Sequence, residues 1–465
     1  MYTNDSIQEE VSVNKSLRFF LSAFILLSMN FGEMPVHSIQ AATTWTVTKA
    51  ADTDDGTCNS DCSLREAIMA AGVGDTIVFK SNQTITLRSQ LPSVDRKITI
   101  KGRGATNTII QASACNPVTL SSGCTPATYR VLAVVSNGNL TLDGVTIRHG
   151  NCDYICDLAG VNGGGIYNSG TLSMKNSAVS HNSTYYTGGG IYNDANGTLT
   201  VTNSTISGNS TDFGGGIDNS GTVTITNSTF SANRANLGGG IWNSSGQTLA
   251  TLTVTKSTFL ANSSNEDGGG IWNSGQITLT GSTFYGNSAY NGGGIYNRDG
   301  GALTVNSSTI SVNRSYKDGG GIYNIGALTV TKSIFHRNSS EDSDGAGGGI
   351  YNDGTTELTV TNSSFSDNSA YSGGGIHNIG TLTVTNSTFS ANSATAYGGG
   401  IYNSYTLYVT DGTFTTNSAE SYGGGIFNGS TLYMTDSTFS GNIAPNNAGI
   451  SNGGEQYLTN TYPDN

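Results

Sequence analysis

The sequence predicts an all-β protein whose main body is a single-stranded parallel β-helix, a solenoid of coils stacked on one another. The triplet GGG occurs eleven times after position 160, at intervals of 24 to 30 residues. A period of this size is typical of solenoids. Within each repeat, apolar residues alternate with Thr and Ser at period two, which indicates strands. With 64 Gly, 6 Pro and 11% charged residues, the composition also differs from that of a helical protein. We expect about 12 regular coils, preceded by irregular coils and a short capping helix.

Residues 1–41 have the features of a signal peptide. Lys15 and Arg18 precede an apolar run at 19–31, and small residues follow at Ser38 and Ala41. The run is shorter than the roughly 20 residues that span a bilayer. We therefore favour a cleaved signal over the alternative, an uncleaved anchor, and predict a secreted or cell-surface protein. No later segment is apolar enough to cross a membrane as a helix.

Six cysteines form three pairs that are close in sequence. An even count in an exported chain favours disulfides, and local pairing is the simplest arrangement. Zinc binding is the alternative, although the spacings contain no CxxC pair. The predicted pairs are Cys58 with Cys62, Cys115 with Cys124, and Cys152 with Cys156.

The chain before the array is predicted to form a cap and irregular first coils. Residues 42–74 carry the first cysteine pair and a helix at 63–71, in which Ser63 is the N-cap and Glu66 completes a capping box. The helix is expected to cover the apolar end of the first coil. Further predicted segments are first coils at 75–160, regular repeats at 161–452 and a C-terminal cap or tail at 453–465. Strands are expected within the first coils at 75–79, 84–91, 97–102, 107–113 and 140–150.

The regular repeat predicts continuous columns of identical side chains. In the coil that starts at Gly188, the interior positions are Ile191, Leu199, Val201 and Ile206. Two Asn positions recur as regularly, and stacked amides about 4.8 Å apart can bond along the column. The glycines are expected at a sharp corner that needs positive φ or close backbone contact.

Two motifs resemble known families. The stretch CSLREAI at 62–68, preceded by ADTDDGTC, resembles the N-terminal module of exported bacterial proteins named for the Cys-Ser-Leu-Arg-Glu-Ala string. The GGGI and FxxN tetrapeptides, such as residues 230–233, resemble repeats of the chlamydial polymorphic outer membrane proteins. These resemblances imply a right-handed β-helix of the pectate-lyase type at a surface or in secretions, and parallel crossovers are generally right-handed. Too few residues follow Phe439 for the C-terminal barrel of the second family.

An aromatic residue usually stands between the Ile and the Asn of each GGGIxN, on the outward side. Such a ladder can contact sugar rings, because aromatic side chains combine apolar faces with polar edges. The alternative is that the aromatics only pair along the strands. Asp218 and His377 are expected to interrupt the ladder. The candidate ligand-binding residues are Trp242, Trp272, Tyr296, Tyr323 and Tyr351.

Acidic residues gather just before several GGG corners. Asp267 and Asp318 are expected two coils apart, about 10 Å at strand spacing. This is close to the roughly 6.5–9.5 Å between the carboxylates of inverting glycosidases. The alternative is that all these carboxylates are solvated loop groups. The candidate catalytic residues are Asp267, Asp318, Asp342 and Asp344.

Two further motifs suggest other activities. Asp52, Asp54 and Asp55 resemble the start of a calcium loop, but Ser63 stands where the distal Glu is expected, so an Asp-rich turn is the alternative. Paired threonines such as Thr253 and Thr255 recur in seven coils. They resemble the ice-binding face of β-solenoid antifreeze proteins, although Thr is also an ordinary strand residue.

The charge balance restricts the partners. A net charge of -12 repels phosphate, so we expect neither nucleic acid nor an anionic membrane as a partner. The favoured hypothesis is a non-enzymatic adhesin or module that binds polysaccharides or other cell-surface components, with no cofactor other than the calcium candidate. The alternative is a polysaccharide lyase or glycoside hydrolase on the same fold, and ice binding is a minor one.

Overall fold

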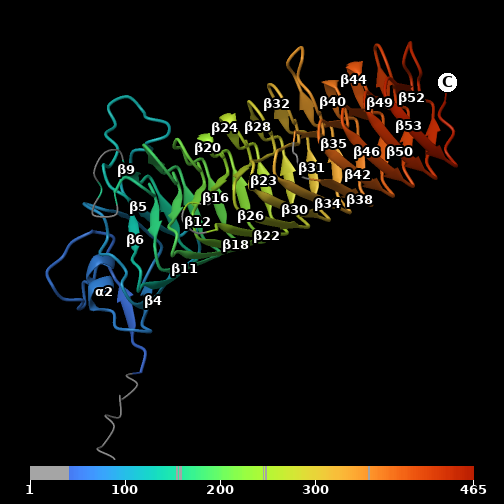
Figure 1. Cartoon of the computed structure of the whole chain (residues 1–465). Helices are drawn as coiled ribbons and strands as arrows, with labels where there is room; N and C mark the ends of the chain where they lie inside the picture. The colour runs from blue at the N-terminus through green and yellow to red at the C-terminus, as the bar shows by residue number, and fades with distance from the viewer. Residues whose placement is uncertain are drawn as a thin grey trace, which may run out of the picture. The chain divides into compact units, whose positions relative to one another are not determined.

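The computed structural model describes residues 41–152, 156, 160–244, 246, 249–353 and 357–464. The chain divides into two units, Met1–Ala41 and Ala42–Asn465, and the second is the solenoid (Figure 1). The predicted signal peptide lies, apart from Ala41, outside the described residues. Within the described part, no helix is both long and apolar enough to cross a membrane.

Parallel strands from successive coils form three long sheets and two shorter ones. In the coil that begins at Gly238, the chain passes through β21 (Ile241–Asn243), β22 (Thr251–Thr255), β23 (Thr258–Leu260) and β24 (Ser263–Asp267) before it reaches the next GGG corner. We name the sheets that contain these strands the aromatic sheet, the Thr sheet, the Phe sheet and the short sheet. The predicted all-β parallel solenoid is therefore confirmed.

The aromatic sheet has 13 strands. They are β6 Leu132–Val134, β10 Ile166–Asn168, β14 Ile191–Asn193, β17 Ile217–Asn219, β21, β25 Ile271–Asn273, β29 Ile295–Asn297, β33 Ile322–Asn324, β37 Ile350–Asn352, β41 Ile376–Asn378, β45 Ile401–Asn403, β49 Ile426–Asn428 and β52 Ile450–Asn452. The short sheet has 8 strands. They are β20 Arg234–Leu237, β24, β28 Ser288–Ala289, β32 Arg314–Ser315, β36 Ser339–Ser340, β40 Ser369–Ser372, β44 Ser393–Tyr397 and β48 Ser418–Ala419, and β9 Asn151–Cys152 pairs separately with β13 Ser183–Thr184.

The Thr sheet has 16 strands and the Phe sheet has 14. The Thr sheet contains β1 Thr44–Val47, β2 Thr76–Phe79, β4 Lys97–Lys101, β7 Asn139–Asp143, β11 Thr171–Lys175, β15 Thr198–Thr202, β18 Thr222–Thr226, β22, β26 Gln276–Thr280, β30 Ala302–Asn306, β34 Ala327–Thr331, β38 Leu358–Thr361, β42 Thr381–Thr385, β46 Thr406–Thr410, β50 Thr431–Thr435 and β53 Glu455–Thr459. The Phe sheet contains β3 Gln83–Thr86, β5 Thr108–Gln111, β8 Thr146–Arg148, β12 Ala178–Ser180, β16 Thr205–Ser207, β19 Thr229–Ser231, β23, β27 Thr283–Tyr285, β31 Thr309–Ser311, β35 Ile334–His336, β39 Ser364–Ser366, β43 Thr388–Ser390, β47 Thr413–Thr415 and β51 Thr438–Ser440.

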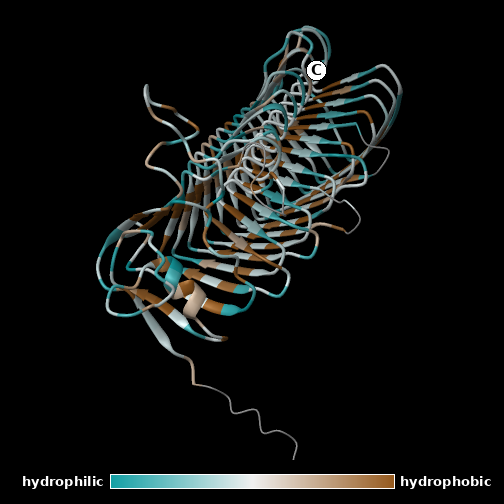
Figure 2. Cartoon of the chain, turned by 90° about the vertical axis from the view of Figure 1, so that its left-hand side faces the viewer, coloured by the Kyte–Doolittle hydropathy of each residue, from teal (hydrophilic) through white to brown (hydrophobic). Residues whose placement is uncertain are grey.

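The interior consists of the predicted apolar columns. Leu252, Val254, Phe259 and Ile271 are all buried and continue in register from coil to coil. The rings of Phe259 and Phe284 stack with centroids 4.5 Å apart. Hydrophobic and polar residues alternate along the strands in Figure 2. Because each coil buries its side chains against its neighbours, a single coil has no core of its own.

The two Asn columns form the predicted hydrogen-bonded ladders. Asn262 donates from its backbone N and from Nδ2 to Oδ1 of Asn287, both at 3.0 Å. In the other ladder, Nδ2 of Asn243 donates to Oδ1 of Asn273 at 2.8 Å. All four residues are fully buried. The first ladder ends where the backbone N and Nδ2 of Asn442 donate to the Asp464 carboxylate, at 2.9 and 3.1 Å.

The GGG triplets make the predicted corner. Gly268 has φ +69°, a conformation that disfavours side chains. A Cβ on Gly269 would lie 2.4 Å from the carbonyl oxygen of Gly293 in the next coil. The corner therefore needs glycine for two reasons, backbone conformation and close packing between coils.

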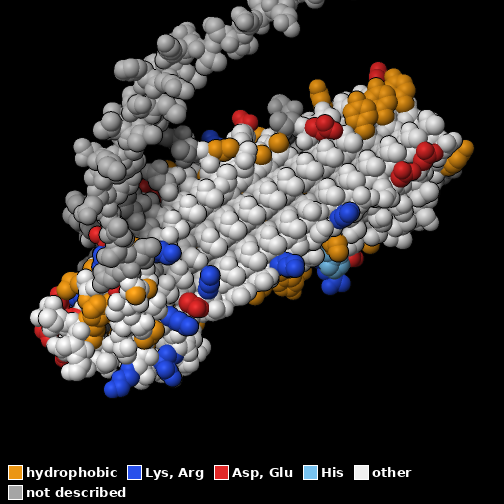
Figure 3. Space-filling model, turned by 90° about the horizontal axis from the view of Figure 1, so that it is seen from below, with side chains coloured by type: hydrophobic (Ala, Val, Ile, Leu, Met, Phe, Trp, Pro, Cys, Tyr) orange, Lys and Arg blue, Asp and Glu red, His pale blue; other side chains and the backbone are white. Residues whose placement is uncertain are grey.

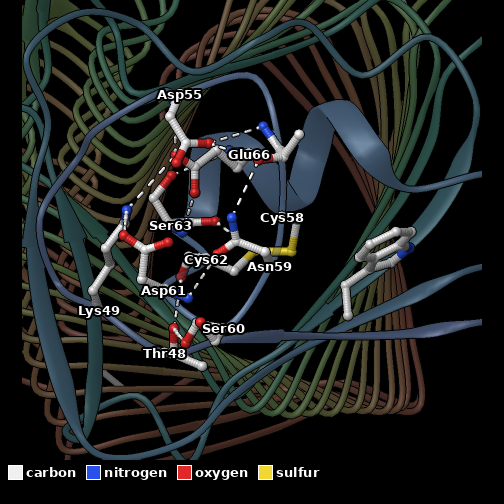
Figure 4. Close-up of a disulfide and its surroundings, with 12 residues drawn as sticks. Thr48, Lys49, Asp55, Cys58, Asn59, Ser60, Asp61, Cys62, Ser63 and Glu66 are labelled. Atoms are coloured by element: carbon white, nitrogen blue, oxygen red, sulfur yellow. Dashed lines mark hydrogen bonds and ion pairs between the residues drawn. A yellow bond between two sulfur atoms is a disulfide. The ribbon is translucent and has the colours of Figure 1, made fainter.

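The N-terminal cap contains the predicted helix, α2 (Leu64–Ala70), with the capping box of Ser63 and Glu66 (Figure 4). Oε2 of the buried Glu66 accepts from the backbone N of Ser63 at 2.7 Å, and Oε1 accepts from that of Asp55 at 3.1 Å. Arg65 makes a two-point ion pair with Asp52, at 2.9 and 2.7 Å. The polar residues of the CSLREA string thus hold the cap together. Since β1 pairs with β2, the Thr sheet begins already within residues 42–74.

All three predicted disulfides are present. They join Cys58 to Cys62 in the cap, Cys115 to Cys124 and Cys152 to Cys156 in the first coils. The division of the chain into the predicted ranges remains a prediction.

Candidate ligand-binding site

The residue between Ile and Asn of each strand of the aromatic sheet belongs to one outward column, the aromatic column. From Trp242 to Phe427 it is continuous. Ring centroids are 4.9 Å apart both between Tyr296 and Tyr323 and between Tyr323 and Tyr351. We predicted that His377 interrupts this column, but it continues the column instead. The centroid of its imidazole ring lies 5.2 Å from that of Tyr351 and 4.3 Å from that of Tyr402, and all three rings are stacked. Stacking covers the faces of the rings, so the column presents mainly ring edges and phenol hydroxyls.

Of the two tryptophans that we expected on the surface, Trp272 is buried, whereas Trp242 is partly exposed. Trp272 is only 5% exposed, and the guanidinium of Arg298 lies 5.8 Å from the centroid of its ring. Trp242 is partly buried, and among the described residues its Nε1 has no hydrogen-bond partner. The prediction of an exposed Trp272 is therefore wrong. Tyr296, Tyr323 and Tyr351 remain partly exposed.

The column does break at Asp218, as predicted, but this carboxyl is fully buried. Burial raises its pKa well above the usual range for an Asp. The nearby Thr187 hydroxyl offsets part of that rise. Among the described residues, however, neither the Thr187 hydroxyl nor the Asp218 carboxyl has a partner at normal hydrogen-bond geometry. Phe213 lies beside the break, 5.0 Å from Trp242.

Two of the acids predicted before the corners, Asp267 and Asp318, belong to a second column beside the first. Nδ2 of Asn291 donates to Oδ1 of Asp267 at 3.0 Å, and the backbone N of Asp318 donates to Oδ1 of Asn291 at 3.3 Å. Asp267 and Asp318 are thus two coils apart in one column, about 10 Å at strand spacing. Burial raises the pKa of both carboxyls.

These carboxylates are close enough to influence the tyrosines. Burial raises the pKa of Tyr296 to about 12, and the charge of Asp267 adds to that rise. Burial also raises the pKa of Tyr351, and the charges of Asp353 and Asp318 add smaller increases. Asp353 was missed in the sequence, although it directly follows an IYN strand. We name Tyr296, Tyr323 and Tyr351, together with Asp267, Asp318 and Asp353, the tyrosine–carboxylate strip.

Asp342 and Asp344, the other catalytic candidates, have a different environment. Oδ2 of Asp342 lies 3.5 Å from Nζ of Lys317, and Asp344 also pairs with Lys317. This ion pair lowers the pKa of the Asp344 carboxyl. Neither carboxylate joins the column of Asp267 and Asp318, although the charge of Asp344 adds to the rise in the pKa of Asp318.

The carboxylates of the three calcium candidates contact other groups of the N-terminal cap. Asp52 pairs with Arg65, whereas Asp54 accepts from the backbone N of Gly56 and Asp55 from that of Thr57, each at 3.0 Å. In the described parts of the chain, no group of three or more His, Cys, Asp or Glu residues could hold a metal ion. The acids at 52–55 therefore form a turn and ion-paired cap.

The paired threonines lie on the outer side of the Thr sheet. Few charged or hydrophobic side chains lie on the central part of the face that Figure 3 shows. Thr253 and Thr278 are opposite each other in register, but the same row ends with tyrosines. The rings of Tyr408, Tyr433 and Tyr457 stack there 5.0 and 4.9 Å apart, and each is at least 40% exposed.

The tyrosine–carboxylate strip combines phenol hydroxyls with hydrogen-bond acceptors over several coils. Carboxylates accept hydrogen bonds from hydroxyl groups, and phenols both donate and accept. A repetitive ligand rich in hydroxyl groups matches this chemistry. Partial burial raises the pKa of the Asp267 and Asp318 carboxyls, and shifts of this kind are also found in the acid–base groups of enzymes.

A protein-family model supports the architecture. The family model described as "Right handed beta helix region" matches residues 118–276 and 267–457, whereas no curated protein matches the chain. Similar solved structures include tailspike protein 3 of bacteriophage CBA120, at 12% identity and TM-score 0.37 over 89% of this chain and 61% of that one. Another is the Agl-KA catalytic domain, at 16% identity and TM-score 0.33 over 84% of this chain and 63% of that one. The chain thus spans less than two thirds of either structure. The matched residues cover most of the solenoid, and the chain therefore belongs to the right-handed β-helix family.

Proposed function

We propose that this chain is a secreted or cell-surface β-helix that binds polysaccharides through the tyrosine–carboxylate strip. The observation that carries the proposal is the position of Asp267 and Asp318 beside the stacked Tyr296, Tyr323 and Tyr351. The tyrosines are held rigidly by stacking and by the strand register, so binding a glycan needs little further ordering of the side chains.

Several weak contacts in a row suit a polymer. Successive tyrosines repeat at the coil spacing, about 4.8 Å, and a sugar unit of a chain is of similar length. Each coil adds a phenol hydroxyl at a fixed interval, so affinity accumulates with the length of the ligand. A polysaccharide is therefore favoured over a monosaccharide.

Binding to a panel of immobilised neutral and acidic polysaccharides tests this proposal. In the double variant Tyr323→Thr, Tyr351→Thr, we expect at least tenfold weaker binding, because loss of central aromatic contacts commonly costs about 2 kcal/mol or more. The matched control is Tyr408→Thr, Tyr433→Thr, which removes a stacked tyrosine pair from the Thr sheet. Unchanged binding in the first variant, or equal loss in both, would contradict the proposal.

The specific arrangement of Asp267 and Asp318 favours a second candidate, an inverting glycoside hydrolase. One carboxyl would protonate the leaving oxygen while the other activates water. Their burial and raised pKa fit the acid role. Release of reducing ends from the same panel, abolished in Asp318→Asn but retained in Asp342→Asn, would establish hydrolysis in place of binding alone.

A further inference from the structure

A groove of about 500 Å³ opens on the outer side of the short sheet, separate from the tyrosine–carboxylate strip. Four consecutive coils line it through residues 183–185, 210–212, 234–236, and 263 with 265. The lining consists almost wholly of hydroxyl, amide and charged side chains. Its volume is within the roughly 300–1,000 Å³ of small-molecule sites.

A bulge in the sheet accompanies the groove. The pairing of β20 with β24 shifts between Ala235 and Leu237, so that Leu237 faces Asp267. Bulges redirect side chains and are common next to functional sites. The amides follow an ordered network: Nδ2 of Asn236 donates to Oδ1 of Asp212 at 2.8 Å, and Nδ2 of Asn265 donates to Oδ1 of Asn236 at 2.7 Å.

Arg234 is the cation of this groove. Its side chain is exposed, and no described residue forms an ion pair or side-chain hydrogen bond with it. Arg314 occupies the same register position three coils further on, through Ser263 and Ser288. There, however, the guanidinium pairs with Glu341. The same position thus carries an arginine whose charge is neutralised by the protein and one whose charge is available to a ligand.

The chemistry of the lining identifies the ligand class. A guanidinium binds a carboxylate through two parallel hydrogen bonds. The surrounding amides and hydroxyls suit sugar hydroxyls, and Tyr185, 52% exposed, supplies an aromatic surface at the edge. We propose that the groove binds an acidic sugar residue of a polysaccharide, with its carboxylate on Arg234. This inference rests on the proposed polysaccharide binding and names the sugar class.

The experiment compares a uronic acid trisaccharide with its methyl ester, which lacks the charge. Titration calorimetry is done at about 0.15 M salt, where the Debye length of about 8 Å screens the net charge of the chain. We expect the parent to bind the acid at least tenfold more tightly than the ester. Arg234→Gln should lose this preference, whereas Arg314→Gln, the matched control, should retain it.

Three results would overturn the inference: no binding of the acid by the parent, equal binding of acid and ester, or an unchanged preference in Arg234→Gln. Melting temperatures of both variants establish that they are folded. The tyrosine variant of the strip is judged separately, on neutral polysaccharides. Failure of the groove therefore leaves the proposed function intact, and failure of the strip is visible without the acidic probe.

Discussion

His377 is an ionisable residue in a position that most other coils fill with an aromatic ring. It stacks between Tyr351 and Tyr402, and Oγ of Ser372 lies 2.9 Å from its Nδ1. Burial lowers the pKa of the imidazole from 6.5 to about 4. The ring is therefore neutral at physiological pH and acts as one more aromatic unit of the column.

This low pKa predicts a stability change in mild acid. Between about pH 6.5 and 4 the unfolded state binds the proton more readily than the folded state, so the free energy of unfolding falls as the pH falls. The loss amounts to at most about 3.5 kcal/mol, at about 1.4 kcal/mol per pKa unit. His377→Phe, which introduces the residue found at Phe427, should remove it. Urea unfolding of parent and variant at pH 7 and pH 4 measures the difference, and parallel pH dependence would contradict the assignment.

At the scale of the elements, the GGG corner is the most constrained part of the coil. A Cβ at Gly269 would meet two backbone oxygens, those of Gly293 at 2.4 Å and Ser288 at 2.5 Å. Backbone atoms belong to strands or corners of the next coil, and they cannot rotate away as a flexible side chain can. The corner therefore limits how closely two coils approach.

Gly269→Ala should accordingly destabilise the protein by about 2 kcal/mol or more, because overpacking of a close-packed interior commonly costs about 1–3 kcal/mol. The control is Gly453→Ala, whose Cβ would have its nearest neighbour, the Asn428 oxygen, at 3.7 Å. We expect that variant to unfold within about 0.5 kcal/mol of the parent. Equal denaturation midpoints for the two variants would show that the corner can relax.

The short sheet was the element that the sequence did not predict. Its strands are as brief as Ser288–Ala289 and contain small or polar residues, so they lack the apolar alternation of the Thr sheet. Their pairing follows from stacking of the other three sheets. The groove beside Arg234 was missed for the same reason.

For the whole molecule, the repeat was sufficient to predict the columns of Leu, Val, Phe and Asn, because a fixed period places equivalent residues in register. It also predicted Asp267 and Asp318 two coils apart. It could not predict that the charge of Asp267 acts on Tyr296, since the distance between the two columns depends on the angle of the GGG corner. Nor could it predict the burial of Trp272, which depends on packing by neighbouring residues such as Arg298.

The N-terminal cap should be essential for solubility. Removal of residues 42–74 deletes α2 and β1, and it exposes the edge of β2 together with the apolar end of the core. Unpaired edges are templates for aggregation. We expect the shortened chain to elute as aggregates in size-exclusion chromatography. A monomer that melts at the temperature of the parent would show that the cap is dispensable.

Asp464 gives one Asn ladder a direction and an end. Every amide in that ladder accepts from the coil before it and donates to the coil after it, so the bonds all have the same polarity. A carboxylate accepts but has no N–H to donate onward, so at Asp464 the series stops. This ladder can therefore be extended from within but not past Asp464. A further coil could be inserted between two existing ones without breaking the ladder, whereas a coil added beyond Asp464 would first need an amide in its place.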